Sequence, residues 1–275
     1  MVANLRLVGV PSLSLDSNEL ARDYERISAT RQFQSGQRLA ADLGILSGER
    51  VLDLGCGTGL LAEHIADLVG PHGSVVGIDP LPLRIELARS KQHANLSFEV
   101  GDANHLDMLE DSSFDVVIMN AVFHWFPEKT RPLLECARVL RPDGRVGIGT
   151  TVKGQRARVH QIASKVLAEP PFDRFPRPRE QLTFPVDSEE MRAFFEITGF
   201  AATLIEVRES TRMWPSPEAA IRFSEASSFG NFLGHLPLEL KARARTTIRQ
   251  RLQGLMTADG IIQHGRRLVA IAVRK

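Results

Sequence analysis

The chain has 275 residues, of which 43% are hydrophobic and 24% charged, so it can bury the core of one large domain or of a domain with a cap. Its net charge of +1 and the lack of a dense basic run give no electrostatic reason to expect a nucleic-acid partner. No segment reaches the roughly 20 apolar residues that span a bilayer, and Cys56 and Cys136 suggest no disulfide framework, so we expect a cytoplasmic protein without a membrane span.

Residues 1–46 are predicted to form an N-terminal helical preface that serves as a lid. The segment 16–19 provides an N-cap with a following acid, and apolar residues then recur at helical spacing as far as Ile27. A second helix is predicted over about 31–43. The preface therefore consists of two helices that lead into the first strand.

The run from Val51 to Leu61 is the most informative segment, because an apolar strand ends in three alternating glycines and then enters an amphipathic helix. Gly55, Gly57 and Gly59 let the backbone pass close to a ligand, and the following helix presents unpaired N–H groups to an anionic group. The dinucleotide-binding fingerprint needs a glycine where Leu60 stands. The run therefore argues against a nicotinamide oxidoreductase.

Four further apolar strands alternate with helices along the next part of the chain, which predicts a parallel, doubly wound sheet. In such sheets, ligands bind at the carboxyl ends of the strands, beside the point where the strand order reverses. Three of the strands end in a polar residue at that edge, namely Asp79, Asp102 and Asn120. We expect these side chains to meet above the glycine run.

Residues 155–275 are predicted to hold helical cap insertions together with the last two core strands. The two strands are expected at 200–207 and 267–273, the second of them at the C-terminus. The insertions are then 155–199 and 210–263. The prolines of 169–178 exclude a helix or an inner strand there.

Taken together, these elements resemble the class I S-adenosylmethionine (SAM) dependent methyltransferases of the small-molecule type. The resemblance covers about half of the chain and follows the family order: Val51-Leu52-Asp53-Leu54-Gly55-Cys56-Gly57-Thr58-Gly59, the strands ending at Asp79, Asp102 and Asn120, and the turn Pro142-Asp143-Gly144. It implies an α/β fold with a doubly wound, mostly parallel, Rossmann-like seven-stranded sheet, N-terminal helices and a helical cap. Residues 47–154 would form the SAM-binding core, with S-adenosylhomocysteine (SAH) as product.

The resemblance also implies roles for individual residues. Asp79 would accept hydrogen bonds from the ribose hydroxyls, and Asp102 from the adenine amino group. Asp53 would lie near the methionine amino group or, alternatively, fix the glycine loop by accepting backbone N–H bonds. The residues expected to contact the cofactor are Tyr24, Asp53, Gly55, Gly57, Gly59, Asp79, Pro80, Asp102, Ala103 and Asn120.

The acceptor side of the site is predicted from the loop after the fourth strand and from the cap. His124 is the candidate general base, since its ordinary pKa suits proton abstraction at neutral pH, with a packing role as the alternative. Trp125, Phe126, Trp214 and Phe229 are expected to line the acceptor site, although aromatic residues of cap helices more often pack internally. The histidines show no paired metal spacing, so we predict no metal site.

The predicted function is transfer of a methyl group from SAM to a small, partly apolar metabolite, of the kind found in secondary metabolism, by in-line displacement in a site that excludes water. The lack of a strong base cluster favours a thiol or a phenol. Arsenite is disfavoured because two cysteines are too few to grip the metalloid. Quinone or sterol C-methylation, N-methylation and a non-catalytic SAM-binding sensor or scaffold stay open.

Overall fold

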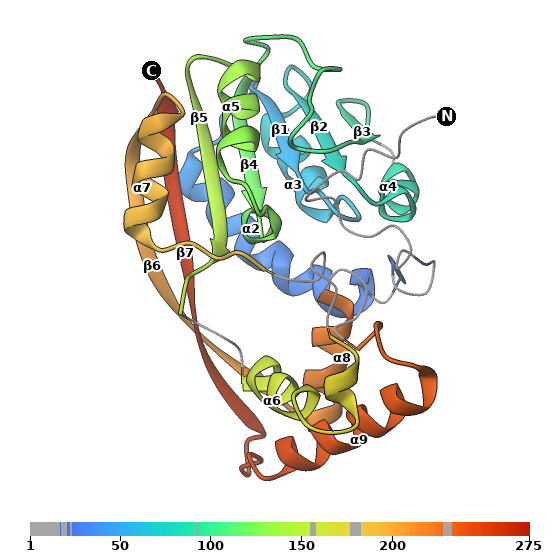
Figure 1. The fold of residues 1–275 in the computed structure, drawn as a ribbon. Coiled ribbons are helices and arrows are strands. Elements are labelled where there is room, and N and C mark those ends of the chain that lie inside the picture. The colour runs from blue at the N-terminus through green and yellow to red at the C-terminus, as the bar shows by residue number, and fades with distance from the viewer. Residues whose placement is uncertain are drawn as a thin grey trace, which may run out of the picture.

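The computed structural model of the chain describes residues 17, 21–22, 24–91, 93–154, 158–176, 183–227 and 233–275. Its centre is a seven-stranded sheet in the order β3-β2-β1-β4-β5-β7-β6 (Figure 1). The pairings among β1 to β5 are parallel, whereas β7 is antiparallel to both of its neighbours. The predicted α/β fold with seven strands is confirmed, and the sheet is mixed at one edge.

The strands are β1 (Arg50–Leu54), β2 (Ser74–Asp79), β3 (Leu96–Val100), β4 (Phe114–Asn120), β5 (Leu140–Thr151), β6 (Phe200–Trp214) and β7 (Ile261–Arg274). The longer helices are α2 (Thr30–Leu43), α3 (Leu60–Val69), α4 (Pro82–Arg89), α5 (Thr130–Val139), α6 (Arg158–Leu167), α7 (Ser188–Ile197), α8 (Pro217–Ser227) and α9 (Leu238–Gln253). Short turns of helix are η2 (Tyr24–Ala29), η3 (Phe123–Trp125) and η4 (Phe172–Arg174).

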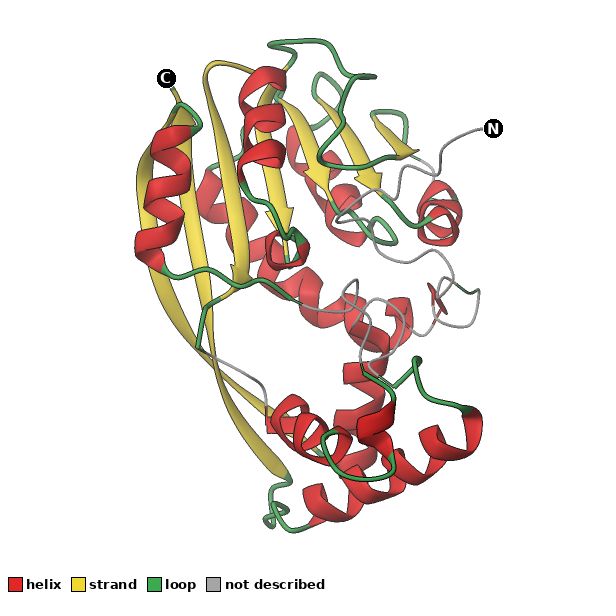
Figure 2. Cartoon of the chain, in the orientation of Figure 1, coloured by secondary structure: helices red, strands yellow, loops and turns green. Residues whose placement is uncertain are grey.

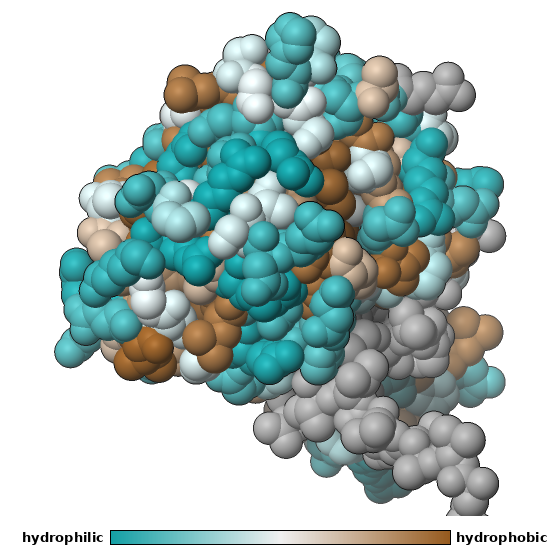
Figure 3. Space-filling view, turned by 90° about the horizontal axis from the view of Figure 1, so that it is seen from above, coloured by the Kyte–Doolittle hydropathy of each residue, from teal (hydrophilic) through white to brown (hydrophobic). Residues whose placement is uncertain are grey.

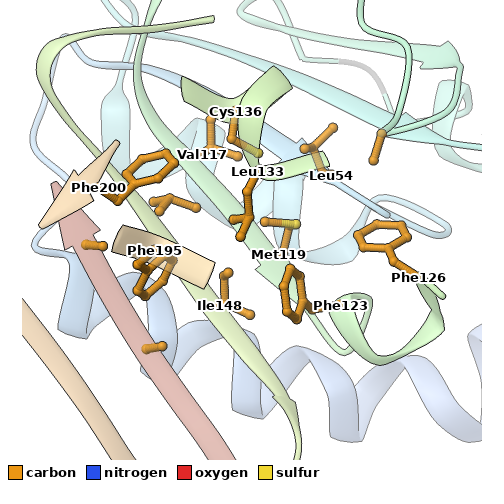
Figure 4. Packing of buried hydrophobic residues seen from close by; sticks show 14 of the residues in the cluster. Leu54, Val117, Met119, Phe123, Phe126, Leu133, Cys136, Ile148, Phe195 and Phe200 are labelled. Carbon is orange, nitrogen blue, oxygen red and sulfur yellow. The ribbon is translucent and has the colours of Figure 1, made fainter. Parts of the chain in front are cut away.

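Helices cover both faces of the sheet (Figure 2). Val51 and Val116 belong to a hydrophobic cluster that also holds residues of α2, α3 and α4, whereas Leu52 and Val117 belong to a second cluster with α5 and α7. Successive residues of a strand point to opposite faces, so strands buried on both sides must be apolar almost throughout. Figure 4 shows this second cluster, in which Phe195 of α7 packs with residues of β4 and α5.

The strand order reverses at β1, which pairs with β2 on one side and with β4 on the other. At such a switch point the two flanking connections leave in opposite directions and open a crevice at the carboxyl ends of the strands. The glycine run follows β1 directly, and Asn120 ends β4. The glycine run and Asn120 therefore lie together at the carboxyl edge of the sheet, as predicted.

The strands β6 and β7 are much longer than predicted. They pair from Phe200↔Arg274 to Trp214↔Ile261, although β5 leaves β7 at Thr151↔Arg267. Beyond that point they form a two-stranded arm, which we define as residues 208–214 and 261–267, and its tip carries α6, α8 and α9 (Figure 1). These helices form a cap with a hydrophobic core of its own.

The structure differs from the predicted organisation in two further places. Helix α7 lies within the predicted insertion 155–199, but Met191 and Phe195 are fully buried in the core cluster of the sheet, so α7 is a layer of the core. The sequence predicts two separate helices in the preface, whereas η2, a π-helix, continues directly into α2. Of the predicted N-cap segment 16–19 only Ser17 is described, and its carbonyl accepts from the N–H of Ala21 at 2.9 Å.

None of the described helices is long and apolar enough to cross a bilayer. Seen from above, the hydrophobic residues at the surface form small patches among hydrophilic ones (Figure 3).

The assignment of α7 to the core predicts how two substitutions on this helix act. Replacing Phe195 with Ala removes a fully buried ring and leaves a cavity, so we expect a loss of about 3–5 kcal/mol in the free energy of unfolding. Ile197→Ala is the matched control, because Ile197 is 65% exposed, and should change stability by about 0.5 kcal/mol or less. Urea unfolding measures both. Equal effects would show that α7 is not a core layer.

Candidate active site

The glycine loop after β1 is closed against the end of β2 by backbone hydrogen bonds. The N–H of Gly55 donates to the carbonyl of Ile78 at 2.7 Å, and the N–H of Gly57 donates to Asp79 Oδ2 at 3.0 Å. The second oxygen of Asp79 accepts from the N–H of Leu81 at 3.0 Å. One buried carboxylate thus fixes both the glycine loop and the turn that enters α4.

Two of the glycines are required for different reasons. Gly57 has a φ of 59°, and a Cβ there would lie 3.1 Å from the Tyr24 side chain, so only glycine lets the loop pass under this ring. Gly59 has a φ of 83°, and its Cβ would meet Phe98 at 2.6 Å. Gly59 therefore serves the packing of α3 against β3, and its predicted contact with the cofactor has no support in this geometry.

A cavity opens at the carboxyl ends of β1, β2 and β4. Most of the residues predicted to contact the cofactor line it, namely Tyr24, Gly55, Asp79, Pro80, Asp102, Ala103 and Asn120.

The two acids at the ends of β2 and β3 have different partners. Asp79 is 2% exposed and accepts backbone N–H bonds from Gly57 and Leu81. Asp102 accepts through Oδ1 from the backbone N–H and the side-chain amide of Asn104, at 3.0 and 2.8 Å. Both acids face the cavity as predicted.

Asp53 is the most unusual charged group of the site. It is 1% exposed, and its Oδ2 has no hydrogen-bond partner among the described residues. Burial, reinforced by the nearby Asp79, raises the pKa of Asp53 to about 7. The loop-fixing role considered for Asp53 falls to Asp79, because the N–H of Gly57 donates to Asp79.

A second, smaller cavity adjoins the first and contains Asp53. It is also lined by Thr58, whose buried hydroxyl has no hydrogen-bond partner among the described residues, and it shares Tyr24 and Asn120 with the first cavity. Buried polar groups are nearly always hydrogen-bonded, so an unpaired carboxylate and an unpaired hydroxyl in one cavity indicate a polar ligand with a cationic group.

Tyr24 covers the glycine loop from η2. Its hydroxyl donates to Gln32 Oε1 at 2.5 Å, and the guanidinium carbon of Arg84 lies 3.9 Å from the ring centroid. Burial raises the pKa of Tyr24 to about 12, so the hydroxyl stays a donor at neutral pH. The preface thus forms a wall of both cavities, as expected for a lid.

Asn120 joins the preface to the sheet. Its Nδ2 donates to the backbone carbonyl of Gln32 at 2.8 Å, and its Oδ1 accepts from Arg267 Nη2 at 2.5 Å and from Ser35 Oγ at 3.3 Å. Arg267 also donates to Ser35 Oγ at 3.0 Å. One amide therefore connects β4, α2 and β7 beside the cavity.

The structure does not support His124 as a general base. Its Nδ1 lies 3.1 Å from Thr150 Oγ1, and it is absent from the lining of both described cavities. Burial is the main cause that lowers its pKa to about 3, and the cations Lys129 and Arg267 lower it further. The ring is therefore neutral and only weakly basic at pH 7, which fits the packing role.

The loop after β4 brings two aromatic side chains to the cavity. Trp125 and Phe126 both line it, as predicted for the acceptor side. The loop is held by Lys129, whose buried ammonium donates to the carbonyls of Phe123 and Phe126 at 2.6 Å each. Burial lowers the pKa of Lys129 to about 7.

The two aromatic residues predicted from the cap are not found in the lining of the described cavities. Trp214 is 4% exposed, and its ring centroid lies 4.9 Å from that of Phe223 in the hydrophobic core of the cap. Its predicted role in the acceptor site is replaced by packing, because the tip of the arm must anchor the cap helices. Phe229 lies outside the described residues.

Comparison with known proteins identifies the core. Residues 45–174 match the family model described as a methyltransferase domain. The chain is 44% identical over 110 residues to the arsenite methyltransferase of Halobacterium salinarum and 41% identical over 111 residues to the demethylmenaquinone methyltransferase of Lactobacillus johnsonii. Each match covers 38% of this chain, but only 28% and 45% of the relatives. The chain thus spans less than half the length of these relatives.

The core is a class I SAM-dependent methyltransferase domain. Among solved structures, the YcgJ protein of Bacillus subtilis has a similar fold, with a TM-score of 0.60. The match covers 88% of this chain and 98% of that one, and the two sequences are 18% identical. The family confirms the resemblance and makes SAM the cofactor for which the site is suited.

Sequence reasoning missed several groups that shape the methyltransferase site. Gln32, Ser35, Arg84 and Arg267 come from helices and from the last strand, where no turn or strand end marks them. Thr58 was within reach of prediction, since it stands inside the glycine run.

Since burial raises the pKa of Asp53 to about 7, a ligand ammonium held by this carboxylate would bind in a pH-dependent way. A ligand ammonium binds the ionised carboxylate, so below pH 7 binding must first remove a proton from Asp53. We expect the SAH affinity to weaken by up to about tenfold per pH unit as the pH falls from 7 to 5. Calorimetry at pH 5, 6, 7 and 8 measures this.

Two substitutions distinguish the titration of Asp53 from that of other carboxylates. Asp53→Asn should bind SAH about tenfold more weakly at pH 8 and show little dependence on pH. Asp67→Asn removes a carboxylate from the exposed side of α3, and it should behave as the unmodified protein does. An affinity of the unmodified protein that stays level from pH 8 to pH 5 would refute the role of Asp53.

Proposed function

We propose that the chain is a SAM-dependent methyltransferase that acts on a thiol or a phenol of a small, partly apolar molecule. The observation that carries this proposal is the buried carboxylate of Asp53 beside the glycine loop and the cavity, because its Oδ2 has no hydrogen-bond partner in the described part of the chain. A cation-accepting group and an open cavity together suit a cofactor with an amino-acid end.

The residues present fit SAM part by part. Asp53 and Thr58 would take the ammonium and the carboxylate of its methionine end, since these are the groups their unpaired atoms can satisfy. Asp79 and Asp102 would take the ribose hydroxyls and the adenine amino group, and Tyr24 would cover the cofactor from the preface.

When bound, SAM supplies an electrophilic methyl group. The chain aligns the acceptor and excludes water, for which Trp125 and Phe126 provide an aromatic wall beside the cavity. Because His124 is weakly basic and off the cavity, an acceptor that ionises readily is favoured. A thiol, with an ordinary pKa of about 8.5, and a phenol, with one of about 10, meet this condition better than an aliphatic alcohol.

The names of the two relatives suggest other acceptors. Arsenite has no support here, because Cys56 and Cys136 are both buried, belong to hydrophobic clusters on opposite faces of the sheet, and have thiol pKa values raised by burial. Carbon methylation of a quinone precursor is the second candidate. It is favoured by the match to the demethylmenaquinone enzyme and by the apolar lining of the cavity.

A non-catalytic SAM-binding sensor is the alternative from another class. It would be favoured by an aromatic plug in the acceptor space. Trp214 is buried in the cap core, and Trp125 forms part of the wall of the cavity. Turnover is therefore the proposed outcome of SAM binding.

Calorimetric titration with SAM, SAH and NAD tests the cofactor. We expect SAM and SAH to bind and NAD not to bind, and Asp79→Asn to weaken SAM binding at least about tenfold through lost hydroxyl contacts. SAH formation with thiophenol, phenol, a naphthoquinol and arsenite then tests the acceptor. SAM binding without turnover on any acceptor would support the sensor, and NAD binding in place of SAM would refute the proposal.

The neutral state of His124 yields a separate prediction. His124→Asn keeps a polar group beside Thr150 and should leave kcat within about threefold, because no proton transfer is assigned to this ring. The pH profile of kcat should likewise show no limb near 6.5, since the pKa of His124 is about 3. A loss of kcat by about 100-fold or more in this variant, with the thermal midpoint unchanged, would restore the general base.

A further inference from the structure

The loop between β3 and β4, residues 101–113, brings Asp102 and Ala103 into the lining of the cavity. Two local contacts shape its first turn. Asp102 Oδ1 accepts from the backbone N–H and the side chain of Asn104, and the carbonyl of Asp102 accepts from the N–H of His105 at 2.9 Å. Because β3 lies at the edge of the sheet, the place of this loop over the cavity depends on contacts with other elements.

Helix α5 holds this loop with an ion pair. Glu135 is 7% exposed, and its Oε2 accepts from the N–H of Leu106 and from Arg138 Nη2, both at 3.0 Å. The same Arg138 nitrogen donates to the carbonyl of Leu106 at 2.8 Å, and Arg138 Nη1 donates to the carbonyl of Leu109 at 2.9 Å. The pair Glu135–Arg138 therefore binds both backbone groups of Leu106.

A third side chain of α5 reaches the turn that carries Asp102. Arg131 lies one helical turn before Glu135, and its Nε donates to the carbonyl of Asn104 at 2.9 Å. Asn104 is the residue whose N–H and side-chain amide both donate to Asp102. Hydrogen bonds therefore run from one helix, through Asn104 and Leu106, to a carboxylate in the lining of the cavity.

The strength of these bonds suits them to place the loop. A buried ion pair alone says little about stability, because the desolvation of its charges offsets their attraction. Burial would raise the pKa of Glu135, but the hydrogen bonds from Arg138 and from the N–H of Leu106 outweigh burial and lower this pKa, so the carboxylate is ionised at neutral pH. Its bonds to the loop are then charge-assisted, and a binding group must be held within about 0.5 Å to be effective.

We propose that Glu135 and Arg138 are positioning residues for the adenine end of SAM, which fix the β3–β4 loop so that Asp102 recognises the amino group of the base. This inference rests on the proposed function, which assigns Asp102 to that amino group, and it names the residues of α5 that set the selectivity for the base. A site built to accept a hydrogen bond from a ligand N–H rejects an analogue that lacks this group. We therefore expect the pair to control selectivity as well as stability.

Calorimetry with SAH and with its 6-deamino analogue, in which hydrogen replaces the amino group of the base, tests this inference. The unmodified protein should bind SAH about tenfold or more tightly than the analogue. Glu135→Met removes the acceptor of the Leu106 N–H, so it should weaken SAH about tenfold and change the affinity for the analogue less than about twofold. Glu135→Gln keeps an oxygen that can accept from Leu106, and should recover most of the selectivity.

Glu49→Met is the matched control. Like Glu135, Glu49 pairs with an arginine and accepts a backbone N–H bond, because it lies 2.7 Å from Arg145 and 2.8 Å from the nitrogen of Leu46. It holds the segment before β1, at the amino end of that strand, whereas the cavity lies at the carboxyl ends. This substitution should lower the thermal midpoint and leave the ratio of the two affinities unchanged.

Arg131→Gln keeps the inference testable if Glu135→Met does not fold, since the Arg131 side chain is 51% exposed. It should lower the ratio of the two affinities about threefold through the lost bond to the Asn104 carbonyl. Equal losses for both ligands in these variants, or an unchanged ratio, would overturn the inference alone. Failure of the unmodified protein to bind SAH would refute the proposed function, and equal binding of both ligands by the unmodified protein would refute its assignment of Asp102.

Discussion

The side-chain amide of Asn120 is the contact on which the rest of the site depends. Its nitrogen holds the main chain of α2 and its oxygen accepts from Arg267, so three segments distant in sequence meet at the end of β4. Tyr24 reaches the glycine loop only because α2 is fixed there, since its hydroxyl bonds Gln32 of that helix. A single strand-end amide thus converts an open sheet edge into a walled cavity.

Charged side chains are buried on both sides of the cofactor site near this amide. Two buried carboxylates, Asp53 and Asp79, lie at the glycine loop. Asp79 accepts from backbone N–H groups, while Oδ2 of Asp53 has no partner among the residues that the structure describes. The cation nearest this amide is Arg267, which donates to its oxygen.

The strand-end residues of the site could be predicted from the sequence because parallel strands impose a rule: polar residues directly after buried apolar runs share one edge. That rule located Asp79, Asp102 and Asn120. It has no counterpart for side chains on helix faces or late strands, so Gln32 and Arg267 escaped prediction. The length of β6 and β7 escaped prediction for a related reason, since most of the residues that extend these strands into the arm are polar and resemble an insertion. Trp214 at the tip of the arm packs into the cap core.

A crystal structure of the protein with SAH would test whether Asp53 receives the amino-acid end of the cofactor. We expect the ligand ammonium within about 3 Å of Asp53 Oδ2, the ribose hydroxyls on Asp79, and the Tyr24 ring over the bound ligand. SAH bound elsewhere, or bound in the cavity with its ammonium in solvent and Asp53 still unpaired, would contradict it.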